Sequence, residues 1–158
     1  MHPNEAIITD FYTCFGQRDY AGMIAHYAPH IHFTDPIFDL CGPQAGAMWH
    51  MLCQGGKDLR VTFANIQADN RQGRAHWEAW YTFSATERQV HNIIEAEFQF
   101  ENGKIARHID HFNFWRWSRQ ALGTTGLLLG WSPLLQDKVK ATASSNLQKF
   151  IAAHSEYQ

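Results

Sequence analysis

Two aspartates and one histidine occupy positions from which side chains could transfer protons. His108 and Asp110 lie two residues apart in a run of β-branched and aromatic residues, so a strand would place both on one face. Asp35 ends a shorter alternating run, on the face of Ile31 and Phe33, where burying a carboxylate is costly unless it is paired, protonated or functional. A carboxyl group removed from water has a raised pKa and can exchange protons near neutral pH. The pattern therefore makes Asp110, His108 and Asp35 candidates for general acid/base chemistry.

Each of these positions also has a purely structural explanation. Aspartate commonly caps a turn before proline, and Pro36 follows Asp35. A buried Asp110–His108 pair can satisfy its own hydrogen bonds without any role in catalysis. The sequence alone leaves both explanations open beside the catalytic one.

The ten histidines raise the question of a metal site. His30 and His32 would share one strand face, but no carboxylate or cysteine joins them at a recognisable spacing. His108 and His111 would point to opposite faces of their strand and could not bind one ion together. No phosphate-binding loop is present either, because the segment 123–126 lacks the lysine and the preceding strand. We therefore expect no metal and no cofactor.

A long hairpin must position His108 and Asp110. Two runs rich in β-branched and aromatic residues, within residues 90–115, flank Asn102-Gly103, and both turn residues of a tight hairpin must tolerate positive φ. Arms of this length predict the central strands of a curved antiparallel sheet.

The rest of the chain supplies the elements around that hairpin. Apolar residues at helical spacing predict a helix over residues 4–16, a short second helix capped by Asp19 and stopped at Ala28-Pro29, and a third from Gly42-Pro43 to Gly55-Gly56. Further strands are predicted at residues 30–35, 59–66 (with a slip in period that indicates a bulge) and 74–83. The tail predicts a short helix at 115–122, a connection at 123–130, and a helix from Ser132-Pro133 almost to the end.

Length and charge limit the classes of protein this can be. A chain of 158 residues fits one domain, and a net charge of −2 provides no basic field for nucleic acid. Its three cysteines cannot all pair, and the start of the chain lacks a secretion signal, so we expect a cytoplasmic protein. The longest apolar run, residues 126–135, is far too short to cross a membrane.

The order of these elements resembles the nuclear-transport-factor-2-like superfamily, and in particular its SnoaL-like branch. Three segments carry the resemblance: Phe33-Thr-Asp-Pro36, the helix at Asp19–Met23, and Glu101–Phe112. It implies an α+β fold, in which a cone-shaped curved antiparallel sheet is wrapped by three N-terminal helices and followed by an additional C-terminal helix. We expect a cone domain over residues 1–115 and a helical extension over 116–158, packed on that domain or on a partner subunit.

The resemblance also implies a pocket inside the cone. Ketosteroid isomerase has its proton-shuttling aspartate at the position of Asp35, whereas SnoaL-type cyclases and limonene epoxide hydrolase use an aspartate at the position of Asp110. The resemblance predicts six ligand contacts: Phe11, Tyr12, Phe33, Trp49, Ala96 and Phe112. Phe11 and Ala96 stand where the isomerase has its oxyanion donors, so steroid isomerase chemistry of the familiar kind is not expected.

Two functions from different classes remain. The first is a cofactor-independent acid/base enzyme (isomerase, aldol-type cyclase, dehydratase or epoxide hydrolase) acting on a small apolar, aromatic or polyketide-like molecule. The second is a non-catalytic ligand-binding or dimerisation module of the same fold. Aromatic residues on both faces of the strand at 74–83 favour a homodimer formed through the sheet. An open cavity reached by Asp110 would favour the enzyme, and a filled interior would favour the module.

Overall fold

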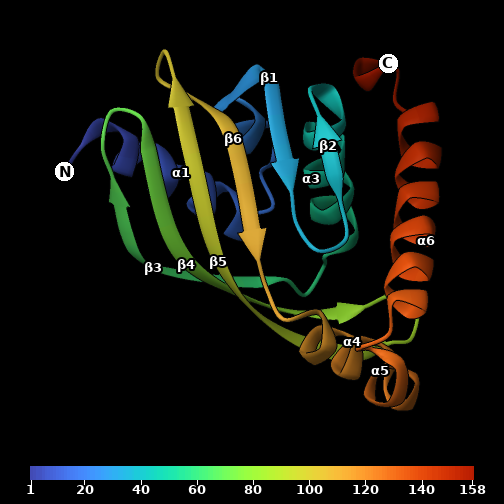
Figure 1. Cartoon of the computed structure of the whole chain (residues 1–158). Helices are drawn as coiled ribbons and strands as arrows, with labels where there is room; N and C mark the ends of the chain where they lie inside the picture. Colours follow the sequence, from blue (N-terminus) through green and yellow to red (C-terminus); the bar gives the residue numbers. More distant parts are fainter.

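A curved, mixed six-stranded sheet forms the frame of the protein, and helices pack against it (Figure 1). The computed structural model describes all residues from 1 to 158. The strands follow the order β2-β1-β6-β5-β4-β3. Their bounds are β1 Tyr27–Thr34, β2 Asp39–Cys41, β3 Arg60–Ala68, β4 Gln72–Phe83, β5 Arg88–Glu101 and β6 Lys104–His111. The predicted α+β class with a curved sheet is confirmed.

One pairing departs from the expected antiparallel sheet, and it matters for the site. β1 runs parallel to β6, with Phe33 opposite His108 and Thr34 opposite Ile109, whereas the other four pairings are antiparallel. Parallel neighbours end at the same edge of a sheet. The residue that follows β1, Asp35, therefore lies at the edge where β6 presents Asp110.

The central hairpin forms as its turn residues predict. Asn102 and Gly103 have φ values of 51° and 73°, and β5 and β6 pair from Glu101–Lys104 up to Glu95–His111. The second arm is shorter than predicted, because the Asn113 side chain accepts a hydrogen bond from the backbone N–H of Arg116 and starts a helix. The segment that follows His111 is thus turned away from the sheet.

The three N-terminal helices also form: α1 Pro3–Gly16, α2 Tyr20–Ile24 and α3 Pro43–Gly55. Asp19 caps α2 as expected, accepting from the backbone N–H of Gly22 at 3.0 Å. The prediction that Ala28-Pro29 ends α2 is wrong, since the helix stops at Ile24 and Pro29 lies within β1. Proline is tolerated there because the pairing of β1 with β6 is irregular between Tyr27 and His32.

Two short features complete the sheet. The bulge indicated by the slip in period is present in β3, where Asn65 has a φ of 57° and the pairing with β4 shifts between Ala64 and Gln67. The strand β2 was not predicted; its three residues are too few to give a periodic signal, and only its pairing with β1 defines it.

The core is built mainly from α1, α3 and the inward face of the sheet. Large aromatic side chains dominate its centre, and several are almost fully buried: Phe11, Tyr12, Phe33, Trp49 and Phe98. Rings from α1 and α3 meet the sheet edge to face, for example Trp49 of α3 and Phe33 of β1, whose centroids lie 5.5 Å apart.

Three helices follow the sheet: α4 Phe114–Leu122, α5 Thr124–Leu129 and α6 Pro133–Ala152. The segment predicted as a connection contains α5, a helix of six residues. α6 stands beside α3 along the edge of the molecule (Figure 1), and only Leu135 and Leu147 of its residues are fully buried. None of the helices is long and apolar enough to span a membrane.

Candidate functional site

A cavity of about 700 Å³ opens at the edge of the sheet where β1 and β6 end. Hydrophobic side chains make up 21 of the 33 residues that line it, so most of its surface suits an apolar ligand. Its acidic lining residues are Asp35 and Asp110. The protein therefore has an open cavity, and both aspartates are among its lining residues.

Asp110 is held in one orientation by two donors. Its side chain is only 4% exposed, and Oδ1 lies 2.9 Å from Nε2 of His108 and 3.3 Å from Nε1 of Trp77. Oδ2 makes no hydrogen bond within the protein, although the residue lines the cavity. One carboxylate oxygen is thus fixed by the protein, and the other is free to meet a ligand.

His108 belongs to a buried chain of hydrogen bonds behind Asp110. Its Nδ1 lies 2.7 Å from the Tyr27 hydroxyl, which in turn accepts from Nε1 of Trp49 at 2.8 Å. Because a carboxylate can only accept, Nε2 of His108 donates to Asp110; in the tautomer with its proton on Nε2, Nδ1 accepts from the Tyr27 hydroxyl. Burial raises the pKa of Tyr27 well above its usual value, so this hydroxyl keeps its proton. His108 is fully buried and does not line the cavity, which makes it a positioning residue for Asp110.

Asp35 combines the two explanations that the sequence left open. Its Oδ1 accepts from the backbone N–H groups of Ile37 at 2.7 Å and Phe38 at 2.6 Å, so it does cap the turn after β1. It also lines the cavity. Burial raises the pKa of Asp35 to about 7; the two backbone donors oppose that shift, and the charge of Asp110 adds to it. Asp35 can therefore gain and lose a proton near neutral pH.

Two polar side chains of the cavity escaped the sequence analysis. The Tyr81 hydroxyl accepts from Nε1 of Trp117 at 2.9 Å, which leaves its own proton free to donate, and burial raises the pKa of Tyr81 to about 12. Asn92 is 8% exposed, lines the cavity, and its side chain makes no hydrogen bond within the protein. The sequence did contain a signal for Tyr81, because the alternation of β4 places Tyr81 on the inward face together with Trp77. Asn92 had no comparable signal, because asparagine is common in turns and on surfaces.

The six predicted ligand contacts divide into two groups. Phe33, Trp49 and Phe112 line the cavity, whereas Phe11, Tyr12 and Ala96 are buried in the core outside its lining. Ala96 lies directly opposite Asp110 across the β5–β6 pairing. The Tyr12 hydroxyl is buried without any hydrogen-bond partner, and burial, reinforced by the nearby charge of Asp110, raises its pKa.

The histidines weighed as metal ligands pair with carboxylates instead. Nε2 of His30 lies 2.5 Å from Glu101, and Nε2 of His32 lies 2.6 Å from Asp39. No three histidine, cysteine, aspartate or glutamate side chains are grouped closely enough to hold a metal ion.

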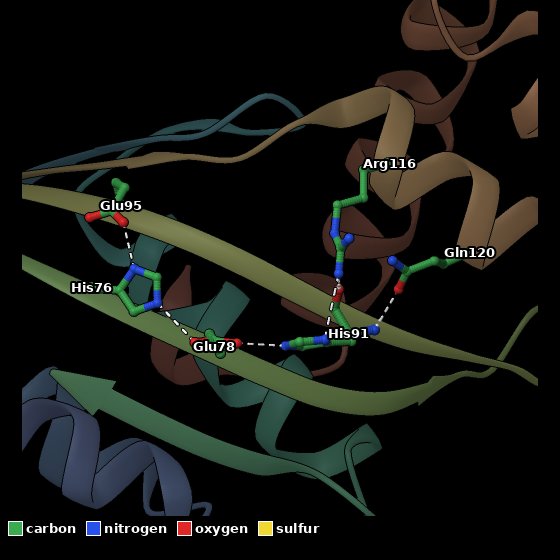
Figure 2. A network of polar contacts seen from close by, with 6 residues as sticks. All are labelled: His76, Glu78, His91, Glu95, Arg116 and Gln120. Atoms are coloured by element: carbon green, nitrogen blue, oxygen red, sulfur yellow. Dashed lines mark hydrogen bonds and ion pairs between the residues drawn. The ribbon is translucent and has the colours of Figure 1, made fainter.

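A second concentration of titratable groups lies on the other face of the sheet (Figure 2). His76 bridges Glu95 at 2.5 Å and Glu78 at 2.9 Å, and Glu78 also binds Nε2 of His91 at 2.7 Å. The hydrogen bonds to the two glutamates raise the pKa of His76. Two residues of α4 join this network at His91. Arg116 donates to the His91 carbonyl oxygen at 3.3 Å, and the Gln120 amide oxygen accepts from the His91 backbone N–H at 2.6 Å. This network ties α4 to the sheet and is separated from the cavity by the strands themselves.

Comparison with known families identifies the fold. The profile of the SnoaL-like domain matches residues 8–108, which is more than half of the chain. This chain belongs to the SnoaL-like family. The match ends within β6, so α4, α5 and α6 follow the part that the family defines. Comparison with curated proteins gives no match.

Solved structures agree with this assignment. An NTF2-like protein of unknown function from Burkholderia pseudomallei superposes with a TM-score of 0.64 at 18% identity, covering 76% of this chain and 98% of its own. An LEH-like epoxide hydrolase from M. tuberculosis superposes with a TM-score of 0.63 at 16% identity, covering 84% of this chain and 95% of its own. The third structure is a protein from Catenulispora acidiphila with a ketosteroid isomerase-like fold, in complex with trimethylamine. It superposes with a TM-score of 0.64 at 9% identity, covering 73% of this chain and 91% of its own. At these identities the similarity establishes the fold alone.

Proposed function

We propose that this SnoaL-like protein is a cofactor-independent acid/base enzyme acting on an apolar, aromatic or polyketide-like molecule that carries an enolisable carbonyl group or an epoxide. The observation that carries the proposal is the pair Asp110 and Asp35 in one apolar cavity. A general acid or base works best when its pKa lies near the operating pH, which is the range of Asp35.

In the proposed reaction, Oδ2 of Asp110 takes a proton from the ligand, and His108 and Trp77 hold that carboxylate in place. Tyr81 and Asn92 donate hydrogen bonds to the oxygen on which negative charge develops, in place of the donors missing at Phe11 and Ala96. Such donors stabilise a developing oxyanion most strongly where water is excluded. Protonated Asp35 donates its own proton at a second position: to carbon in isomerisation, to the new alkoxide in aldol-type cyclisation, or to the departing hydroxyl in dehydration. For an epoxide, Asp110 instead takes the proton of the attacking water, and Asp35 protonates the epoxide oxygen as its C–O bond breaks. Exchange with solvent then removes the proton from Asp110 and restores the one on Asp35.

The test is proton exchange on a simple substrate. An apolar cyclic ketone such as tetralone is incubated with the protein in deuterated water, and NMR follows loss of the proton next to the carbonyl. We expect the parent to accelerate exchange and Asp110→Asn to lower the rate by about 100-fold or more. Asp137→Asn is the control, because Asp137 is exposed on α6 and does not line the cavity. Equal rates for parent and Asp110→Asn, both in exchange on ketones and in hydrolysis of epoxides, would refute the proposal.

A non-catalytic ligand-binding module is the alternative. It is favoured by the hydrogen bonds that Asp35 and Asp110 already make within the protein. A module would bind the ketone without accelerating exchange, so ligand-observed NMR on the same samples distinguishes the two functions.

We further propose that the protein forms a homodimer through the outward face of the sheet. Ile93 is 37% exposed on that face and lies directly opposite Glu78 in the β4–β5 pairing. Sedimentation velocity should give a dimer for the parent and a monomer for Ile93→Arg. The three unpaired cysteines fit a reducing compartment, and we propose a cytoplasmic location.

A further inference from the structure

One wall of the cavity comes from outside the family-defining part of the chain. Residues of α6 line it together with the sheet and α3, among them Leu135, Val139 and Ala143. These three are spaced four residues apart, so they form one stripe along the helix. The family match ends at residue 108, and the superposed structures cover at most 84% of this chain. The part of the chain that the family profile matches therefore ends before α6 begins.

The wall is fixed at its far end. Leu147 is 1% exposed, and the Phe150 ring meets His50 of α3 at a centroid distance of 5.0 Å. Beyond α6, the Tyr157 hydroxyl lies 2.9 Å from Nδ1 of His50, and the His50 ring stacks on Tyr20 with a centroid distance of 3.6 Å. These contacts anchor the C-terminal half of the helix, and the N-terminal half carries the stripe that faces the cavity.

The same helix places a cation at the cavity. Lys138 is the only lysine or arginine among the lining residues, and it makes no ion pair or hydrogen bond within the protein. It is exposed, whereas Asp110 is buried. The lining thus combines a buried carboxyl group on β6 with an exposed positive charge on α6.

We infer that α6 selects the ligand: its apolar stripe limits the size of a planar aromatic body, and Lys138 binds an anionic group on that body. This inference rests on the proposed function only in that both use the same cavity. The ligand class is an aromatic or polycyclic molecule with a carboxylate, sulfonate or similar anion at the end away from Asp110.

Two fluorescent probes that differ in one group test the inference. Anilinonaphthalene sulfonate carries an anion, and N-phenylnaphthylamine has the same rings without it. At low salt the sulfonate should bind the parent about threefold more tightly than the neutral probe does. A gain of this size is what one exposed ion pair provides. Lys138→Gln should remove that advantage and leave the neutral probe unchanged. Lys140→Gln is the matched control, since Lys140 lies on the same helix but outside the lining.

The size of the cavity is tested with a second matched pair. Ala143→Trp should weaken both probes about tenfold, because the indole would occupy the space of the ligand. Ala141→Trp should leave both unchanged, since Ala141 is exposed and does not line the cavity. Circular dichroism and thermal melting verify that each variant folds, and Ala143→Leu replaces Ala143→Trp if the larger side chain disrupts α6.

A further variant separates failure of this inference from failure of the proposed function. Met51→Trp enlarges a lining residue on α3. If it weakens binding and Ala143→Trp does not, the cavity binds ligand but α6 does not select it, and the inference is overturned. If neither weakens binding, the cavity is not the ligand site, and the proposed function loses its basis as well. Loss of binding in Leu128→Gln, on the exposed side of α5, would also overturn the inference, because the probes would then bind outside the cavity.

Discussion

Two tyrosines in the core, Tyr27 and Tyr12, should respond in opposite ways to the loss of a hydroxyl group. The Tyr27 hydroxyl accepts from Trp49 and donates to His108, and all three side chains are buried. In Tyr27→Phe, the indole N–H and the imidazole Nδ1 both lose their partner. Each unsatisfied buried group costs about 1–3 kcal/mol, so with two such groups this variant should lose about 2–6 kcal/mol of the free energy of unfolding.

Tyr12→Phe removes the same atom from an equally buried ring, but with no partner to leave behind. The Tyr12 hydroxyl makes no hydrogen bond, so its removal relieves a desolvation cost. Tyr12→Phe should therefore raise the free energy of unfolding by about 0–1 kcal/mol.

Urea unfolding followed by tryptophan fluorescence measures both variants, with circular dichroism as a second probe. A typical domain is stable by about 5–15 kcal/mol, so the loss expected for Tyr27→Phe remains within the measurable range. Equal destabilisation by the two variants would refute the hydrogen-bond chain behind Asp110, since burial alone would then explain the effect.

Three further predictions concern charge and backbone. The pKa of Asp35 rises from 3.8 to about 7 on folding, so its contribution to stability is present below pH 4 and is lost as the pH rises to about 7; Asp35→Asn should flatten stability against pH across that window in urea titrations. The pKa of His76 is raised by its glutamate partners, so NMR should find it titrating above 6.5, and Glu95→Gln should lower that midpoint. Gly103→Ala should cost about 1 kcal/mol because of the positive φ, whereas Gly55→Ala, at the open end of α3, should be neutral or stabilising by thermal melting.

The parts of the fold that the sequence predicts well are those encoded locally. Asn102-Gly103 specifies its own turn, and Asp19 caps α2 with an oxygen three residues from its donor. The start of α4 at Asn113 was equally local, yet the apolar residues around it read as a continuing strand. A cap and a strand periodicity competed there, and the cap decided the structure.

The site was only partly predictable, because it depends on pairings between distant segments. The alternation of β6 places Asp110 and His108 on one face, but nothing local indicates that β1 runs parallel to β6 and brings Asp35 to the same edge. Tyr27, the second partner of His108, lies 81 residues away in the sequence. The contribution of α6 to the cavity could not be predicted either, since an apolar stripe is the same whether it covers a core or faces a ligand.

The acid groups and the α6 wall belong to different parts of the chain. Asp110 and Asp35 are carried by neighbouring strands whose spacing is set by backbone hydrogen bonds, while α6 meets the rest of the protein mainly through its contacts with α3. Under the proposals made above, replacing the inward stripe of α6 would change which ligands the cavity accepts while leaving Asp110 and Asp35 in register. For protein engineering, α6 can thus be varied separately from the sheet that carries the two aspartates. Mutant libraries confined to residues 135–146 would be a direct way to seek variants that bind other molecules.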